Sequence, residues 1–304
     1  MKAVQFKHYG GPEVLELVDL PDPHPGPGQV RITVRAAGIS ASDTKIRRGE
    51  LSFGATLPQT TGADVAGVVD EIGDDVTDVA VGDRIFGISD NQAAAAEYAL
   101  LTYRAPIPPS LGFADAAGIP AALETATRGL DQLHVTAGTT LFVNGASGGV
   151  GTATVQLALA RGARVIGSAG ARNSGFLGTL GAEPVVYGNG MTDRVRALAP
   201  DGVDVALDVA GNGVLPELIA LAGGEAKNVI TVADFASAEA HGVHFSNGFA
   251  DGNAFHALAT IGDLIEAGKF WLPVERTYPL ADIAEAHHAA ETGHVRGRLV
   301  LIVN

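Results

Sequence analysis

The residues with the clearest chemical potential form one glycine-rich stretch, Asn144-Gly-Ala-Ser-Gly-Gly-Val-Gly151. A short apolar run, residues 140–143, comes before it, and apolar residues recur at helical spacing over residues 150–161. This order predicts a strand, a tight turn and a helix. Glycines allow such a turn to bend sharply and approach a pyrophosphate, whose charge is attracted by the positive end of the following helix. The stretch therefore indicates phosphate binding.

Two functional hypotheses fit this turn. The dinucleotide frame G-x-G-x-x-G falls on Ala146, Gly148 and Gly151, with alanine in its first position. The same turn fits G-x-S-x-G, which carries the nucleophile of many serine hydrolases and would make Ser147 that nucleophile. Such a hydrolase also needs a later acid and then a histidine. The chain offers Asp208 for the acid and His241 or His244 for the histidine. The long β-rich segment before the turn argues against this alternative, as does the lack of an upstream His-Gly-Gly segment.

Length and composition limit the class of protein. With 304 residues, of which 46% are hydrophobic, the chain can bury a sizeable core in about two domains. A net charge of −14 repels nucleic acids and anionic membranes, so neither is an expected partner. The absence of cysteine removes disulfides, thiolate zinc sites and catalytic thiols. The N-terminal residues lack the apolar core of a signal peptide, and no apolar run is long enough to span a membrane, so we expect a cytoplasmic protein.

The pattern of elements predicts an α/β protein with two domains. Residues 1–110 contain short strands with turn residues between them, at 2–6, 15–19, 29–35, 66–72 and 84–87, which indicates an irregular β domain. From residue 121 helices and strands alternate, which predicts a doubly wound parallel sheet. The expected helices are 121–133, 150–161, 173–180 and 193–198, and the strands are 140–143, 164–167, 185–186, 204–208, 228–232 and 243–245. Helices are also expected at 255–267 and 280–291. The last strand, 298–303, should rejoin the sheet of the first domain. The domains are therefore predicted as 1–119 with 250–304, and 120–249.

Motifs spread over nearly the whole chain point to one family. They are Gly10-Gly-Pro-Glu-Val-Leu15, Ala36-Ala-Gly-Ile39, Gly62-Ala-Asp-Val-Ala-Gly-Val-Val69, Val81-Gly-Asp-Arg-Ile-Phe-Gly87, the glycine turn and Gly293-His-Val-Arg-Gly-Arg-Leu-Val300. With these motifs the chain resembles the medium-chain dehydrogenases/reductases, in their zinc-free quinone oxidoreductase and enoyl reductase branch. The resemblance implies a GroES-like substrate domain, a Rossmann cofactor domain, an active-site cleft between them, a nicotinamide cofactor and a homodimer.

The resemblance also bears on metal and proton transfer. Zinc-dependent relatives carry a cysteine and a histidine where this chain has Ser40 and Ala63, so no metal is expected. Many relatives carry a tyrosine proton donor in the segment that corresponds to residues 48–54, and this chain has none there. Ser40 and Thr44 are the remaining candidates, with Asp43 orienting the backbone or a water. The histidine pairs at 241 and 244 and at 287 and 288 are interpreted as solvated surface residues. Adjacent histidines such as 287 and 288 diverge on a helix, and the pair at 241 and 244 lacks acidic partners at ligand spacing.

The end of the second Rossmann strand indicates the cofactor. An acid there accepts a hydrogen bond from the ribose of NAD, whereas a cation suits the 2′-phosphate of NADP. Here the strand is followed by Ser168-Ala-Gly-Ala-Arg172-Asn173, which has no acid, so Ser168 could donate to the phosphate and Arg172 could pair with it. NADP(H) is therefore favoured. The resemblance adds Tyr187 at the same phosphate, Thr125 at the nicotinamide end and Arg298 in the last motif. The other expected cofactor contacts are Ala146, Ser147, Gly148, Gly149, Val150 and Gly151.

The expected reaction follows from the groups that the chain lacks. Reduction of a simple ketone leaves an alkoxide that needs a strong electrophile or acid, whereas hydride addition to an enone or quinone spreads the charge over an enolate or phenolate. A small quinone or α,β-unsaturated carbonyl is therefore the expected acceptor. The residues expected to line its pocket are Phe53, Phe235, Phe245 and Phe249. An enoyl-thioester reductase and a non-catalytic NADPH-binding sensor remain as alternatives.

Overall fold

The computed structural model describes residues 1–52, 54 and 56–304. The chain divides into two compact units, which are described one at a time. Unit 1 comprises Met1–Ala121 and Leu258–Asn304, and unit 2 comprises Ala122–Ala257. None of the helices in the described part of the chain is long and apolar enough to cross a lipid bilayer.

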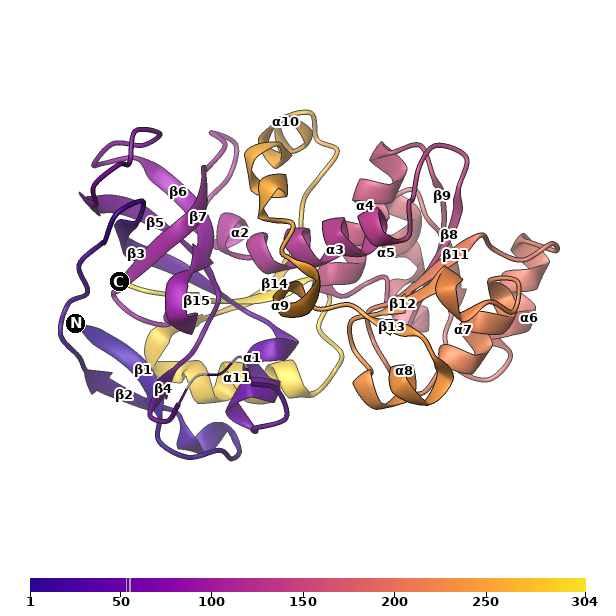
Figure 1. The fold of residues 1–304 in the computed structure, drawn as a ribbon, viewed down its shortest axis with the longest axis horizontal. Coiled ribbons are helices and arrows are strands. Elements are labelled where there is room, and N and C mark those ends of the chain that lie inside the picture. The colour runs from indigo at the N-terminus through magenta and orange to yellow at the C-terminus, as the bar shows by residue number, and fades with distance from the viewer. Residues whose placement is uncertain (53, 55) are drawn as a thin grey trace. The chain divides into compact units, whose positions relative to one another are not determined.

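Unit 1 is built on a six-stranded sheet in the order β14-β15-β3-β5-β6-β7, in which β3 also pairs with β7 (Figure 1). The strands are β3 (Val30–Ile39), β5 (Asp64–Ile72), β6 (Arg84–Ser89), β7 (Tyr98–Pro106), β14 (Val274–Pro279) and β15 (Arg298–Ile302). A smaller sheet contains β1 (Lys2–Phe6), β2 (Glu16–Asp19) and β4 (Gln59–Thr60). Along β3, Val30, Ile32 and Val34 are buried in alternation, because alternate side chains of a strand point to the same face.

The C-terminal strand joins the N-terminal part of unit 1, as predicted. Leu299 to Ile302 of β15 lie opposite Ile39 to Ala36 of β3 in antiparallel register. Two strands of this sheet, β7 and β14, were not predicted. In β14, the run Val-Glu-Arg-Thr-Tyr-Pro buries only Tyr278, so it lacks the apolar pattern by which buried strands are found. Pairing with β15, rather than the composition of β14, keeps it extended.

Short helices complete unit 1. They are α1 (Ala41–Arg47), α2 (Phe113–Ala117), α10 (Ile261–Glu266) and α11 (Ile283–Glu291). The single helix predicted at 255–267 is wrong, because a 3₁₀ turn at Phe255–Ala259 is followed by the separate α10. The helix predicted at 280–291 likewise begins with a 3₁₀ turn, Leu280–Asp282, before α11.

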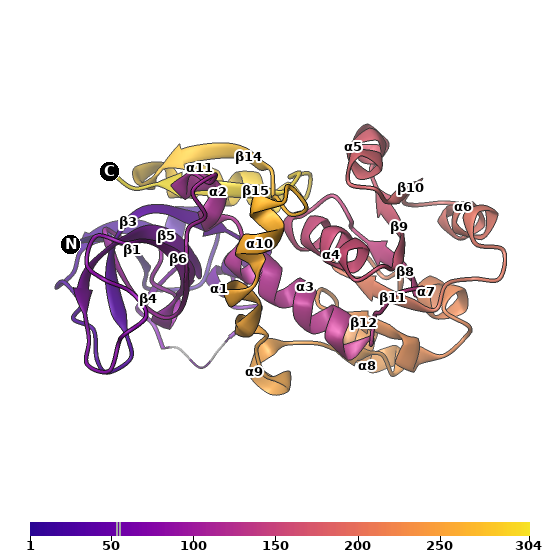
Figure 2. The same cartoon turned by 90° about the horizontal axis from the view of Figure 1, so that it is seen from above.

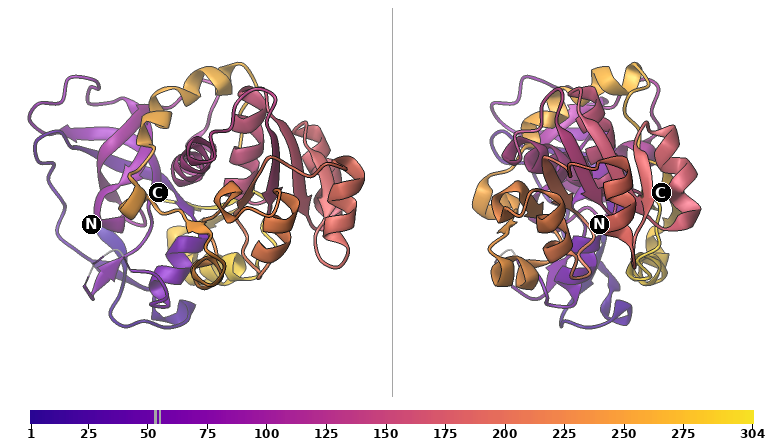
Figure 3. Two further views of the ribbon diagram at one scale, coloured as in Figure 1. Left: turned by 45° about the vertical axis from the view of Figure 1, so that its right-hand side comes forward. Right: turned by 90° about the vertical axis from the view of Figure 1, so that its right-hand side faces the viewer.

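Unit 2 is built on a parallel sheet in the order β10-β9-β8-β11-β12-β13. Figure 3 draws the ribbon from two further sides. The strands are β8 (Thr140–Asn144), β9 (Arg164–Ala169), β10 (Glu183–Val186), β11 (Val205–Asp208), β12 (Val229–Thr231) and β13 (His244–Phe245). All of these pairings are parallel. This is the doubly wound Rossmann order, in which the direction of winding reverses between β8 and β11. The predicted α/β fold class is confirmed.

Helices connect the strands of unit 2 as alternation requires. They are α3 (Pro120–Gln132), which begins at the boundary of unit 1, α4 (Gly149–Ala160), α5 (Ser174–Thr179), α6 (Met191–Leu198), α7 (Leu215–Leu221), α8 (Phe235–His241) and α9 (Gly248–Asp251). The core between these layers includes Phe142, Ile166 and Val195, none of which has measurable exposure. Parallel strands buried on both faces consist of almost continuous apolar runs, which explains why β8 and β9 could be found from the sequence.

Candidate dinucleotide site

The turn between β8 and α4 requires glycine at two positions. Gly145 has a φ of +84°, and a Cβ atom on Gly151 would lie 2.2 Å from the carbonyl oxygen of Gly145. Both positions therefore exclude larger residues for reasons of backbone geometry and packing. Gly148 differs, since it has an extended backbone and the nearest atom would lie 3.7 Å from an added Cβ. Open space at Gly148 suits close approach of a ligand.

The start of α4 is accessible and carries no acidic residue in its first turn. Ser147, Gly148, Gly149 and Val150 are partly exposed, whereas Ala146 and Gly151 are buried. The first N–H groups of a helix have no partner within the helix, and the helix dipole gives this end a partial positive charge. The turn and the helix start therefore fit the diphosphate of a dinucleotide.

A row of polar side chains crosses the carboxyl edge of the sheet. The strand register places Ser168 of β9, Asn144 of β8, Asp208 of β11 and Thr231 of β12 side by side. The Ser168 hydroxyl donates to Asn144 Oδ1 at 2.7 Å, and Asn144 Nδ2 donates to Asp208 Oδ1 at 2.8 Å. The Thr231 hydroxyl donates to the other oxygen of Asp208 at 2.7 Å. This edge row, as we call it, spans the switch point of the sheet.

The edge row holds the loops that follow the strands. Asp208 Oδ1 also accepts from the N–H groups of Ala210 and Gly211, and Ser168 Oγ accepts from the N–H of Gly145. The residues were predicted in part, but their connection was missed. The signal was present in three of the predicted strands, because Asn144 directly follows 140–143, Ser168 directly follows 164–167, and 204–208 ends in Asp208. Parallel strands bring such ends to one edge.

Ser168 lies behind the turn, where its side chain has no exposed surface. Its hydroxyl donates to Asn144 Oδ1, and its oxygen accepts from the N–H of Gly145. The structure therefore places this hydroxyl in the support of the glycine turn, whereas the sequence suggested donation to a phosphate.

Arg172 and Tyr187 lie at the surface beyond the end of β9. Arg172 is exposed in the 3₁₀ turn Ala171–Asn173. Tyr187 follows β10, is 55% exposed, and its ring Cε1 lies 3.5 Å from the position of a Cβ on Gly170. The backbone N–H of Tyr187 donates to Ala169 at 3.2 Å, which ties it to the end of β9. A cation and a phenol thus flank a strand end that has no acid in residues 168–173.

The hydrolase alternative is wrong, because its residues are not brought together. Ser147 Oγ accepts from Asn173 Nδ2 at 3.1 Å rather than meeting a histidine. Asp208 is engaged in the edge row. His241 Nδ1 lies 2.9 Å from the carbonyl oxygen of Ser237, and His244 Nε2 lies 3.1 Å from Asp251. Within the part of the chain that the structure describes, no serine, histidine and acid are connected by hydrogen bonds in the order that acyl transfer needs.

The other residues predicted in unit 2 occupy separate places. Thr125 donates to Glu124 at 3.1 Å, and Glu124 forms a buried ion pair with Arg128 at 2.7 Å. Phe235 and Phe245 meet edge to face, with 5.4 Å between ring centroids. Phe249 is 81% exposed on α9. Phe53 lies outside the described residues.

In unit 1, Ser40 caps α1, and its hydroxyl donates to Asp43 Oδ2 at 2.7 Å. Burial raises the pKa of the Asp43 carboxyl above its usual value. Thr44 is 4% exposed and donates to the carbonyl oxygen of Ala41 at 2.9 Å. Arg298 is buried and pairs with Asp64, and its burial lowers the pKa of the guanidinium to about 10. Both predicted proton donors thus have local roles in α1.

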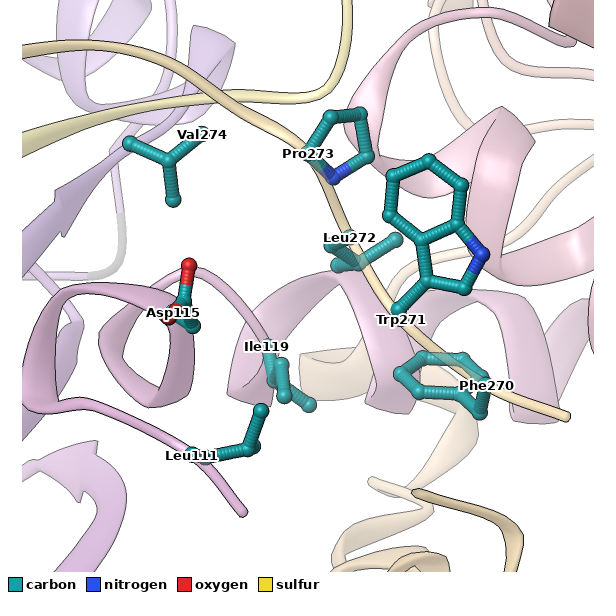
Figure 4. A pocket seen from close by; sticks show the side chains of 8 residues that line it. All are labelled: Leu111, Asp115, Ile119, Phe270, Trp271, Leu272, Pro273 and Val274. Carbon is teal, nitrogen blue, oxygen red and sulfur yellow. The ribbon is translucent and has the colours of Figure 1, made fainter. Parts of the chain in front are cut away.

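Unit 1 also contains a hollow of about 230 Å³, drawn in Figure 4, that includes none of the predicted site residues. The buried residues that line it include Ile119, Phe270 and Leu272. The exposed residues that line it include Asp115 and Trp271. It is too apolar to serve a phosphate.

Comparisons with known proteins identify the family. Residues 26–122 match the alcohol dehydrogenase GroES-like domain, and residues 180–301 match the zinc-binding dehydrogenase family. The quinone oxidoreductase of Mus musculus is 32% identical over 327 residues, which cover 100% of this chain and 98% of the relative. The chain belongs to the medium-chain dehydrogenase/reductase superfamily, in its quinone oxidoreductase branch.

Two further similarities agree with this placement. The structure of the quinone oxidoreductase from Coxiella burnetii has 31% sequence identity and a TM-score of 0.84, covering 100% of this chain and 99% of that one. The chloroplastic NADPH-dependent alkenal/one oxidoreductase of Arabidopsis thaliana is 31% identical over 99% of this chain and 79% of its own length. As a medium-chain dehydrogenase/reductase, the chain is an oxidoreductase of a family that uses nicotinamide nucleotides.

Among the described residues of this medium-chain dehydrogenase/reductase, the structure brings together no set of side chains that could hold a zinc ion. The sequence has no cysteine, and within the described ranges no three His, Asp or Glu residues are grouped so that they could hold a metal. Ser40, which the resemblance aligns with a zinc ligand of zinc-dependent relatives, donates instead to Asp43. The glycine turn, in contrast, has the open backbone that a dinucleotide needs.

Proposed function

We propose that this protein is an NADPH-dependent, zinc-independent reductase that transfers a hydride to a quinone or an α,β-unsaturated carbonyl. The observation that carries the proposal is the end of β9. There Arg172 and Tyr187 are both exposed, and residues 168–173 include no carboxylate. An acid at this place would repel a 2′-phosphate, whereas a guanidinium and a phenol can bind it. The name of the Arabidopsis relative, an NADPH-dependent enzyme, supports the same cofactor.

The nucleotide would be oriented by the glycine turn and the edge row. When bound, the nicotinamide supplies the hydride. The N–H groups at the start of α4 would hold the diphosphate, and Gly148 would let the backbone come close to it. The edge row fixes the turn before any ligand arrives, because Ser168 and Asn144 already bond the backbone and each other. Such preorganisation reduces the entropy lost when the reactants are aligned.

The acceptor class follows from the proton donors available. Thr44 is buried and bonded to Ala41, and Ser40 is bonded to Asp43, so neither resembles a strong acid for an alkoxide. An enolate or a hydroquinone anion is far less basic than an alkoxide, so water or a weak hydroxyl donor suffices. We therefore favour activated double bonds and quinones over simple ketones. The alkenal/one relative and the quinone oxidoreductases carry names of these two classes.

The test is the oxidation of NADPH and NADH by the purified protein with three acceptors in parallel: 9,10-phenanthrenequinone, a simple enone and a crotonyl thioester. We expect turnover with the quinone or the enone, and a preference for NADPH. Turnover of the thioester alone would favour an enoyl-thioester reductase. Tight NADPH binding without oxidation by any acceptor would instead support a nucleotide-binding sensor and refute the proposed activity.

A variant tests the cofactor assignment. Arg172→Ala should weaken NADPH binding about ten- to a hundredfold, since it removes a charge-assisted bond to the phosphate, and should leave NADH nearly unchanged. Arg196→Ala removes another exposed arginine of unit 2, on α6, and serves as the control. Equal loss of both nucleotides in Arg172→Ala would show that this residue does not recognise the 2′-phosphate.

A further inference from the structure

Arg194 of α6 is enclosed by the loop that carries Tyr187. Its Nε donates to the carbonyl oxygen of Val186 at 3.0 Å, and its Nη2 donates to the same oxygen at 2.6 Å. Nη2 also lies 3.4 Å from the carbonyl oxygen of Gly188 and 3.0 Å from that of Asn189. One guanidinium therefore forms hydrogen bonds with backbone carbonyl groups on both sides of Tyr187.

The backbone of this loop is shaped to make that enclosure possible. Gly188 has a φ of +85° and Gly190 a φ of +76°, both in the left-handed region that glycine adopts without strain. The two glycines turn the chain so that successive carbonyl groups face inward, toward Arg194. Figure 2 shows the short path from β10 to α6 on which the loop lies.

The loop in turn sets the position of Tyr187. Its ring lies against Gly170 at the end of β9, and its N–H is bonded to Ala169. The bonds from Arg194 fix the carbonyl groups immediately before and after Tyr187. Because 55% of Tyr187 is exposed, the ring has few packing neighbours, so the position of its backbone and its contact with Gly170 limit where the hydroxyl can lie.

We propose that Arg194 is a positioning residue for the 2′-phosphate of NADPH. It acts by holding Tyr187 at the end of β9, and its charge adds to the attraction of a phosphomonoester there. The inference rests on the proposed use of NADPH but assigns a role to a residue outside the strand end itself. Preorganisation of this kind raises affinity because the loop loses no further freedom on binding.

The probes are adenosine 2′,5′-bisphosphate, which carries the 2′-phosphate, and AMP, which lacks it. Their dissociation constants are measured by calorimetry on the whole protein, so that the readout does not depend on turnover. Arg194→Met removes the hydrogen bonds and the charge while keeping a similar length. We expect this variant to raise the dissociation constant of the bisphosphate about tenfold, which corresponds to the loss of one charged hydrogen bond. The dissociation constant of AMP should rise by less than about twofold. Arg196→Met, on the same helix, should change neither.

A double-mutant cycle separates positioning from a general effect on the fold. In the Tyr187→Ala background, Arg194→Met should weaken binding of the bisphosphate by less than about threefold, because the tyrosine that Arg194 positions has been removed. Equal weakening of both nucleotides by Arg194→Met, or an undiminished tenfold loss in the Tyr187→Ala background, would overturn the inference. A parent protein that binds both nucleotides equally would instead refute the NADPH proposal, and the role of Arg194 with it.

Discussion

The two units differ in how they bury polar side chains. In unit 2, the side-chain oxygens and nitrogens of the edge row all have hydrogen-bond partners. In unit 1, several buried polar atoms have no hydrogen-bond partner among the described residues. These atoms are Asp43 Oδ1, Arg47 Nε and Nη1, Arg104 Nε, His287 Nδ1 and Arg298 Nε. Unit 2 has one such atom among the described residues, Gln132 Oε1, which is not part of the edge row.

Side-chain size and sheet geometry explain the difference. The edge row consists of Ser, Asn, Asp and Thr, whose few donors and acceptors meet a neighbour at the spacing of adjacent strands. Arg47 and Arg298 each bring five N–H donors into an interior that supplies one carboxylate each, Glu291 and Asp64. The ends of parallel strands can thus form a fully bonded scaffold for a ligand, whereas Arg47 and Arg298 keep buried nitrogen atoms without hydrogen-bond partners.

The largest effect is expected for Asp208→Ala. This carboxylate accepts from Asn144, Thr231 and two backbone N–H groups, all of which would lose their acceptor. We expect the free energy of unfolding to fall by about 3–5 kcal/mol, measured by urea unfolding with circular dichroism. Asp201→Ala, at an exposed turn of the same unit, should change it by less than about 0.5 kcal/mol. A loss for Asp208→Ala as small as that of the control would mean that the edge row contributes no stability.

The glycine turn allows packing to be separated from ligand binding. Gly151→Ala places a Cβ against the backbone of Gly145, so we expect a loss of stability of about 3 kcal/mol, toward the upper end for overpacking. Gly148→Ala meets open space and a φ of −76°, so stability should change by less than about 1 kcal/mol.

Nucleotide affinity gives the second half of this comparison. If the diphosphate approaches the backbone at Gly148, Gly148→Ala should weaken NADPH binding about tenfold despite its native stability. Calorimetric titration of the folded variant measures this directly. Unchanged affinity would place the diphosphate elsewhere on the turn.

The sequence predicted the parts of the molecule that depend on local pattern. The strand, turn and helix around Gly145 to Gly151 were found because apolar runs and glycines determine them locally. The parallel sheet and the return of β15 to the first sheet were likewise found, from alternation and an apolar terminal run. The strand β14 was missed, because its pairing with β15, and not its composition, makes it a strand.

The candidate site was predicted less completely, because its connections are tertiary. Ser168 was identified at the correct strand end, but the partner of its hydroxyl depends on the register with Asn144, which no local pattern reveals. Arg194 was not identified, since its role depends on a loop that folds around it. His287 was predicted at the surface and that prediction is wrong. It is 1% exposed, because α11 turns this face toward the core together with Ile283 and Ala286.

His287 also gives the smallest expected effect, a dependence of stability on pH that distinguishes unit 1. Burial, followed by the charge of Arg47, lowers the pKa of His287 to about 3 from the ordinary 6.5. The folded protein therefore keeps this histidine neutral, while the unfolded chain binds a proton below about pH 6.5. Stability from this group is complete above that pH and falls as the pH drops toward 3, by about 2 kcal/mol between pH 7 and pH 5.

Unfolding curves at pH 7, 6 and 5 measure this slope for the parent protein and for two variants. His287→Leu should flatten the slope by about 2 kcal/mol over this range, because it removes the titrating group. At pH 7 it should be nearly neutral for stability, since the Nδ1 atom it deletes has no partner to lose. His288→Leu, the exposed neighbour on α11, should leave the slope unchanged. If both variants kept the slope of the parent, the acid sensitivity would belong to other groups. The buried atoms of unit 1 that lack hydrogen-bond partners would then not explain how stability depends on pH.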